Sequence, residues 1–143
     1  MRNIFTFIFF TFFIFSCAGQ SFKGIRVDYL KGLTLEIDGA GEIFTYDTVS
    51  LDESHYLMNS NLSFGAMIIN GRLIQLKLVS EKKLLHSKYI DVFKGGAYKI
   101  IITTNRKLID GGKFTSEGVM EIIMGKLKRR IKIRTAGFDP RYK

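Results

Sequence analysis

The first seventeen residues, MRNIFTFIFFTFFIFSC, constrain this chain most. Arg2 and the amino terminus give a short positive start, and the 12 residues from Ile4 to Phe15 carry no charge. A bilayer-spanning helix needs about 20 apolar residues, whereas a shorter run of this kind is typical of the apolar region of a secretory signal peptide. Seven phenylalanines in one run would promote aggregation on a folded surface. We therefore expect residues 1–16 to be an export signal and not part of the folded body.

The only cysteine of the chain, Cys17, directly follows this apolar run. Residues Ile14, Phe15, Ser16 and Cys17 resemble the lipobox of bacterial lipoprotein signal peptides, although the family usually has a small residue where Phe15 stands. The resemblance covers residues 1–17 alone. It implies that the Cys17 thiol carries a diacylglyceryl group, that cleavage before Cys17 makes it the first residue, and that this lipid holds the protein at a membrane of the bacterial envelope.

Two other outcomes fit the same segment. Ser16 and Ala18 are small residues at the two positions that a signal peptidase site needs, so cleavage after Ala18 would release a soluble periplasmic or secreted protein. An uncleaved segment would instead remain as an anchor. We divide the chain into a signal peptide at 1–16, a tether at 17–24 and a single β-rich domain at 25–143, because about 125 residues suit one core.

Alternating apolar and polar residues after the tether predict short antiparallel strands separated by glycine turns. Asn70-Gly71 is the strongest hairpin signal, because a type I′ turn needs positive φ at both central residues. Residues 51–61 are predicted to be a loop or one turn, and residues 81–93 are left open between helix and strand, with strand favoured after Ser87. The sequence predicts a mainly β fold, either a single antiparallel β-sandwich or a small β-barrel built from hairpins. The strands are predicted at residues 25–29, 33–47 (a hairpin), 62–69, 74–78, 98–104, 119–124 and 127–135.

Positive charge gathers in the second half of the chain, where residues 61–143 hold 18 basic and 6 acidic side chains. Read as a strand, the run KLKRRIKIR at 126–134 places five basic residues on one face. One interpretation is a solvated outer face, which is ordinary for antiparallel sheets. The other is contact with an anionic lipid or glycan surface. No aromatic residue interleaves the run, so nucleic acid is not an expected partner. The five residues are Lys126, Lys128, Arg130, Lys132 and Arg134.

No catalytic motif, metal-ligand spacing or cofactor loop stands out in the sequence. His55 and His86 are the only histidines, and no cysteine follows Cys17, so neither a zinc site nor a disulfide is expected. We predict no catalytic residue, metal or cofactor, and a non-enzymatic binding or structural module of the cell envelope. An enzyme would need a cleft that holds His55 or His86 against a carboxylate.

The main alternative is a small β-barrel that carries an apolar ligand. In that case Tyr98, Ile100, Ile102 and Val119 would line an interior cavity and would not belong to a filled core.

Overall fold

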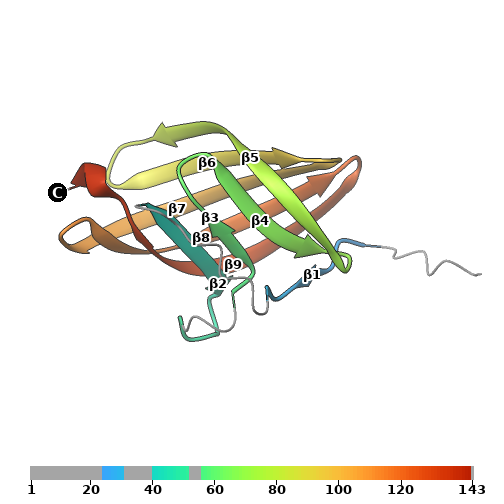
Figure 1. The fold of residues 1–143 in the computed structure, drawn as a ribbon, viewed down its shortest axis with the longest axis horizontal. Helices are drawn as coiled ribbons and strands as arrows, with labels where there is room; N and C mark the ends of the chain where they lie inside the picture. The colour runs from blue at the N-terminus through green and yellow to red at the C-terminus, as the bar shows by residue number, and fades with distance from the viewer. Residues whose placement is uncertain (1–23, 31–39, 52–55, 143) are drawn as a thin grey trace, which may run out of the picture.

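The structure is a computed structural model that describes residues 24–30, 40–51 and 56–142. Strands β2 to β9 form a closed antiparallel barrel of eight strands, and β1 lies beside β4 as an extra strand (Figure 1). No helix among the described residues is long and apolar enough to cross a membrane. The elements are β1 (Val27–Asp28), β2 (Gly41–Tyr46), β3 (Met58–Ser60), β4 (Phe64–Ile69), β5 (Arg72–Lys83), β6 (Lys88–Gly95), β7 (Tyr98–Asp110), β8 (Lys113–Met124), β9 (Leu127–Phe138) and the 3₁₀ helix η1 (Pro140–Tyr142).

From β2 onward, every strand pairs with the next strand along the chain, and β2 pairs with β9 to close the ring. The closing ladder runs from Gly41 opposite Phe138 to Tyr46 opposite Ile133. Because the ring is closed, each of these eight strands is paired on both sides over at least part of its length. The prediction of a mainly β antiparallel domain is confirmed, and of its two forms the barrel is the observed one.

The two ends of the barrel differ in what lies there. The β3–β4, β5–β6 and β7–β8 connections and η1 lie at one end, which we call the polar end (Figure 1). The β4–β5, β6–β7 and β8–β9 turns lie at the other, together with β1, and we call it the β1 end.

Most hairpin predictions are confirmed. Asn70 and Gly71 have φ values of 51° and 75°, as a type I′ turn requires. A helix within residues 81–93 is wrong, because β5 continues to Lys83 and β6 begins at Lys88. The turn between them has His86 and Ser87 at positive φ. The predicted strand at the start of the 33–47 hairpin lies mainly outside the described residues.

Two strand predictions need correction. Met58–Ser60 is a strand and not a loop, because β2 and β4 supply ladders on both sides of a segment with no alternation of its own. The strands β7 and β8 extend well beyond the predicted ranges, to Asp110 and from Lys113. The missed parts carry polar inward-facing residues, so the apolar alternation that predicts a strand is lost there.

The inward side chains form one core that is apolar for most of the length of the barrel. Along β7 the inward residues change from Ile100 and Ile102 to Thr104 and then Arg106 toward the polar end. The neighbouring β8 and β9 make the same change. A polar layer therefore follows the apolar core. Fully buried side chains include Phe44, Leu57, Met58, Met67, Ile69, Leu76, Ile100, Ile102, Met120, Ile122 and Ile133.

Gly118 marks the level at which β8 passes from the apolar core to the polar layer. A Cβ built on Gly118 would overlap the backbone carbonyl oxygen of Thr103 and would lie 2.9 Å from the Cα of Thr104. Both obstacles are backbone atoms of β7, which no change of rotamer can move. Glycine is therefore required here by the close approach of two backbones.

We expect Gly118→Ala to lower the free energy of unfolding by about 1–3 kcal/mol, the usual cost of overpacking. Urea unfolding followed by circular dichroism measures this change. Gly24→Ala is the control, since a Cβ at Gly24 meets no heavy atom within 4 Å. Equal stabilities of the Gly118→Ala variant and the unchanged protein would contradict the packing described.

Candidate functional site

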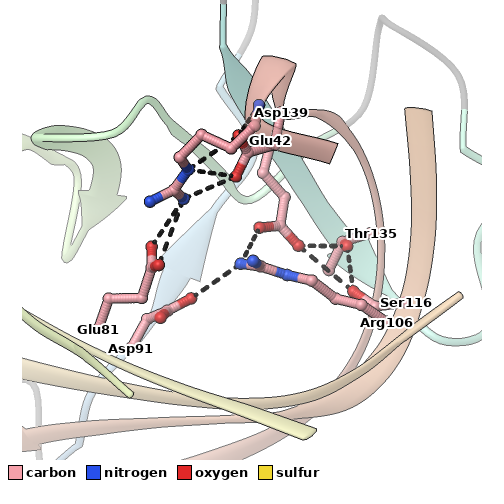
Figure 2. A network of polar contacts seen from close by, with 8 residues as sticks. Glu42, Glu81, Asp91, Arg106, Ser116, Thr135 and Asp139 are labelled. Carbon is pink, nitrogen blue, oxygen red and sulfur yellow. Dashed lines mark hydrogen bonds and ion pairs between the residues drawn. The ribbon is translucent and has the colours of Figure 1, made fainter. Parts of the chain in front are cut away.

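A buried arginine occupies the interior of the polar end. Arg106, on β7, has a side chain that is 7% exposed, and its Nη2 donates hydrogen bonds to Glu42 Oε2 and Asp91 Oδ2, both at 3.2 Å (Figure 2). Its guanidinium carbon lies 4.1 Å from the centroid of the Tyr89 ring and 4.8 Å from that of Phe114. Two carboxylates and two aromatic rings thus replace the water that this cation loses on burial.

Two hydroxyl groups complete the hydrogen bonding of Glu42. The Ser116 hydroxyl donates to Glu42 Oε1 at 3.3 Å, and the Thr135 hydroxyl donates to the same oxygen (Figure 2). The two hydroxyl oxygens also lie within hydrogen-bond distance of each other. Because each hydroxyl has a single proton, the two can donate in only two of these three contacts at a time. Glu42 comes from β2, Ser116 from β8 and Thr135 from β9, so this group connects three adjacent strands at the seam where the barrel closes.

A second ion-pair group, nearer the surface, holds the C-terminus. Arg141, in η1, donates from Nη2 to Asp139 Oδ2 at 2.6 Å and from Nε to Asp139 Oδ1 at 2.9 Å. The same Nη2 lies 3.3 Å from Glu81 Oε1 at the far end of β5. These hydrogen bonds from Arg141 lower the pKa of Asp139. The C-terminal turn is therefore fastened across the polar end of the barrel.

Burial dominates the electrostatics of the inner carboxyl groups. Loss of water raises the pKa of Asp91 to about 7, although the positive charge of Arg106 acts in the opposite direction. Burial raises the pKa of Glu42 as well, against the same arginine and the two hydroxyls. Asp91 Oδ1 and the Thr104 hydroxyl are buried without a hydrogen-bond partner. One arginine thus faces two carboxyl groups that both resist ionisation.

The space beside this group is small. Glu42, Asp91 and Arg106 line a cavity of about 30 Å³. A buried water needs about 10–15 Å³ of such volume, whereas pockets for small-molecule ligands measure about 300–1,000 Å³. The cavity has room for one or two water molecules and polar groups to bind them. Its geometry is that of a structural polar layer and not of a substrate pocket.

The predicted basic face of β9 is largely as expected. Lys128, Arg130 and Lys132 are exposed on the outer wall, Arg134 is half-buried, and Lys126 lies in the β8–β9 turn. The residues between them, Ile131 and Ile133, face the core.

Part of the positive charge on this wall is compensated. Lys128 Nζ lies 2.9 Å from Glu121 Oε2, and Arg130 Nε lies 4.0 Å from Glu121 Oε1. These exposed pairs contribute little to stability. The wall remains basic, but less so than the run of five charges suggests.

Several of the other positions named from the sequence lie outside the described residues. They are Cys17, the predicted export signal and His55. His86 is exposed in the β5–β6 turn. Within the described parts of the chain, no group of three His, Cys, Asp or Glu side chains is placed to hold a metal ion. The predicted absence of a metal, a cofactor and a catalytic residue stays a prediction.

Sequence reasoning missed the whole buried polar layer. A signal for it does exist in the pattern of β6, where Asp91 shares one face with Tyr89 and Phe93. An acid at period two between aromatic residues indicates an inward carboxyl that needs a partner. The identity of that partner, Arg106, carries no such signal.

No protein-family model, no curated protein and no solved structure matches this chain.

We expect Arg106→Met to lower the free energy of unfolding by about 3–5 kcal/mol, because it leaves two buried carboxyl groups without their cation. Adding Glu42→Gln and Asp91→Asn to the same chain replaces both acids by neutral amides and should restore much of the loss. Denaturant unfolding measures both variants. Arg130→Met, on the outer wall, should change stability by less than about 0.5 kcal/mol. A loss for Arg106→Met no larger than for Arg130→Met would contradict the role given to Arg106.

Stability should fall as the pH rises from about 4 to about 7. Over this range the folded state keeps a proton on Asp91 that the unfolded state has released, since the pKa of Asp91 is about 7 in the fold and 3.8 ordinarily. Asp91→Asn should flatten most of this slope, and Glu42 contributes a remainder of the same sign. Unfolding at a series of pH values measures the effect. Asp110→Asn, an exposed change, serves as the control, and an unaltered slope in the Asp91→Asn variant would refute this account.

Proposed function

We propose that this protein is an exported bacterial envelope protein held at a membrane by acyl chains on Cys17, and that its barrel is a non-enzymatic binding module. The observation that carries the second part is the filled interior. Side chains such as Phe44, Met67 and Ile122 are fully buried inside the barrel, and the cavity in the polar layer, beside Glu42, Asp91 and Arg106, is about 30 Å³. Binding therefore falls to the outer surface and the ends of the barrel.

Only one observation, the closure of the barrel, supports carriage of an apolar ligand. The residues that would line its cavity are placed differently from what this function needs. Ile100 and Ile102 are 0% exposed and belong to the packed core, and Tyr98 packs against that core. Val119 alternates with the buried Met120 along β8 and thus faces outward. A carrier would have to open the barrel and displace its own side chains.

Catalysis by the buried acids is also less well supported than binding at the surface of the barrel. A substrate must reach a general acid or base within hydrogen-bond distance. Glu42 and Asp91 are 7% and 5% exposed, and the space beside them admits only one or two waters. Their raised pKa values follow from burial and do not by themselves indicate catalysis.

Replacement of Cys17 by Ser tests the anchor. The unchanged protein should fractionate with membranes and yield an N-terminal peptide whose mass includes acyl chains. Cys17→Ser should lose both the added mass and the processing, since serine offers no thiol for acylation. Ser21→Ala, a few residues further along, is the control and should behave as the unchanged protein. An N-terminus without added mass in the unchanged protein would refute the lipoprotein proposal.

A further inference from the structure

Exposed apolar side chains gather at the polar end of the barrel. Eight large apolar residues are exposed in the described parts of the chain, and six of them belong to this end, with exposed fractions from 46% to 82%. They stand on the β3–β4 connection, the start of β4, the second half of β5, the β5–β6 turn and the end of β7. We call these six residues the mouth rim: Leu62, Phe64, Val79, Leu85, Leu108 and Ile109.

Backbone hydrogen bonds tie the segments of the mouth rim to one another. The amide of Leu78 donates to the carbonyl of Ser63 at 2.8 Å, which joins the middle of β5 to the β3–β4 connection. The amide of Arg106 donates to the carbonyl of Ser87 at 2.9 Å, which joins β7 to the β5–β6 turn. The rim is therefore a set of neighbouring tips and not a chance scatter along the sequence.

The same segments carry an excess of positive charge. Their acidic residues are Glu81, Asp110 and Asp139, and two of these are ion-paired with Arg141. Apolar tips interspersed with lysines complement a surface that is anionic outside and apolar beneath. The exposed lysines of these segments are Lys82, Lys83, Lys88, Lys107 and Lys113.

We propose that the mouth rim docks on an anionic lipid bilayer, with its apolar tips below the headgroups and its lysines among them. This rests on the proposed function, in which the filled barrel binds through its surface. A protein interface usually has a well-packed core that is depleted of charged residues. Here polar side chains interrupt the apolar ones, since Asp139, Arg141 and Glu81 line the same recess as Leu62. Separate apolar tips suit a fluid surface, which fills the gaps between them.

The described chain begins at the opposite end. The extra strand β1 pairs with the end of β4 next to the β4–β5 turn (Figure 1). Arg129 Nη1 donates to the carbonyl of Ile25 at 2.8 Å. The 12 residues of β8 span about 30 Å along the axis of a tilted barrel. The seven peptide units from Cys17 to Gly24 reach at most about 25 Å. When the protein is anchored through Cys17 and the barrel axis is perpendicular to that membrane, the mouth rim lies on the side away from the anchoring bilayer. The rim then faces a second bilayer.

Introduced tryptophans test the docking directly, because the chain has none of its own. Leu85→Trp places the probe on the rim, and Leu73→Trp places it at the β1 end, where Leu73 is 49% exposed. Each variant is made in the Cys17→Ser background, so that no acyl chain contributes, and is mixed with vesicles of phosphatidylcholine and phosphatidylglycerol, or of phosphatidylcholine alone. We expect a blue shift and protection from acrylamide for Leu85→Trp with anionic vesicles only. A shift confined to Leu73→Trp, or no shift at either site, would overturn the proposal.

A second measurement uses vesicle affinity in the Cys17→Ser background, where no acyl chain contributes. Leu85→Ser, Leu108→Ser and Ile109→Ser together should weaken binding to the anionic vesicles by about tenfold or more. Leu73→Ser with Leu127→Ser, at the β1 end, is the matched control and should leave affinity unchanged. Circular dichroism verifies that both sets fold. Equal affinities, or binding of an acidic protein in place of vesicles, would refute docking on lipid.

Clustering of vesicles tests the orientation. The acylated protein should aggregate anionic vesicles, as judged by light scattering, and the rim variant should not. Acylated protein that binds vesicles without clustering them would overturn contact with a second bilayer. Loss of acylation at Cys17 would instead refute the proposed anchor, while the tryptophan result for the rim would stand.

Discussion

The backbone ladder between β2 and β9 is the contact on which the rest of the structure depends. It joins strands that are about ninety residues apart in the chain and turns a meander of hairpins into a ring. Closure pairs each of the eight strands on both sides over part of its length and so leaves little edge for another chain to extend. It also separates inward side chains from water, so that every polar group that points inward needs a partner from another strand. The apolar core and the polar layer are both consequences of this closure.

The polar layer lies next to that seam. Glu42, on the closing strand, accepts hydrogen bonds from Arg106 on β7 and from hydroxyls on β8 and β9. A buried group of this kind contributes less to stability than to selecting one arrangement, because its partners are satisfied only in the correct register. Asp91 and Glu42 lie beside this single arginine, and burial raises the pKa of both groups. The free energy of unfolding therefore depends on pH. We interpret this group as the element that sets the cross-section of the barrel at the polar end.

The ends of the barrel are closed by different means, and this separates their roles. At the β1 end, Ile25 and Val27 extend the apolar core, and Arg129 holds the backbone there. At the polar end, η1 is fastened by ion pairs of Arg141, while apolar side chains stand outward on the surrounding loops. Charged side chains are thus buried inside the polar end, while apolar side chains stand outside it among exposed lysines. Large exposed apolar patches are typical of surfaces that contact another molecule or a membrane.

The sequence by itself determined the strand-and-turn character of the chain, because alternation and turn chemistry act over a few residues. Asn70-Gly71 and the isoleucine alternation of β9 predicted their hairpins for this reason. The predicted export signal and the proposed role of Cys17 also rest on local pattern, and these residues lie outside what the structure describes. Only the tertiary structure decided between sandwich and barrel, because that choice depends on β2 meeting β9. It alone placed Arg106 between Glu42 and Asp91, and gathered Leu62, Leu85 and Ile109 at one end. Contacts between residues far apart in the chain leave no periodic trace in the sequence, and only closure of the sheet brings them together.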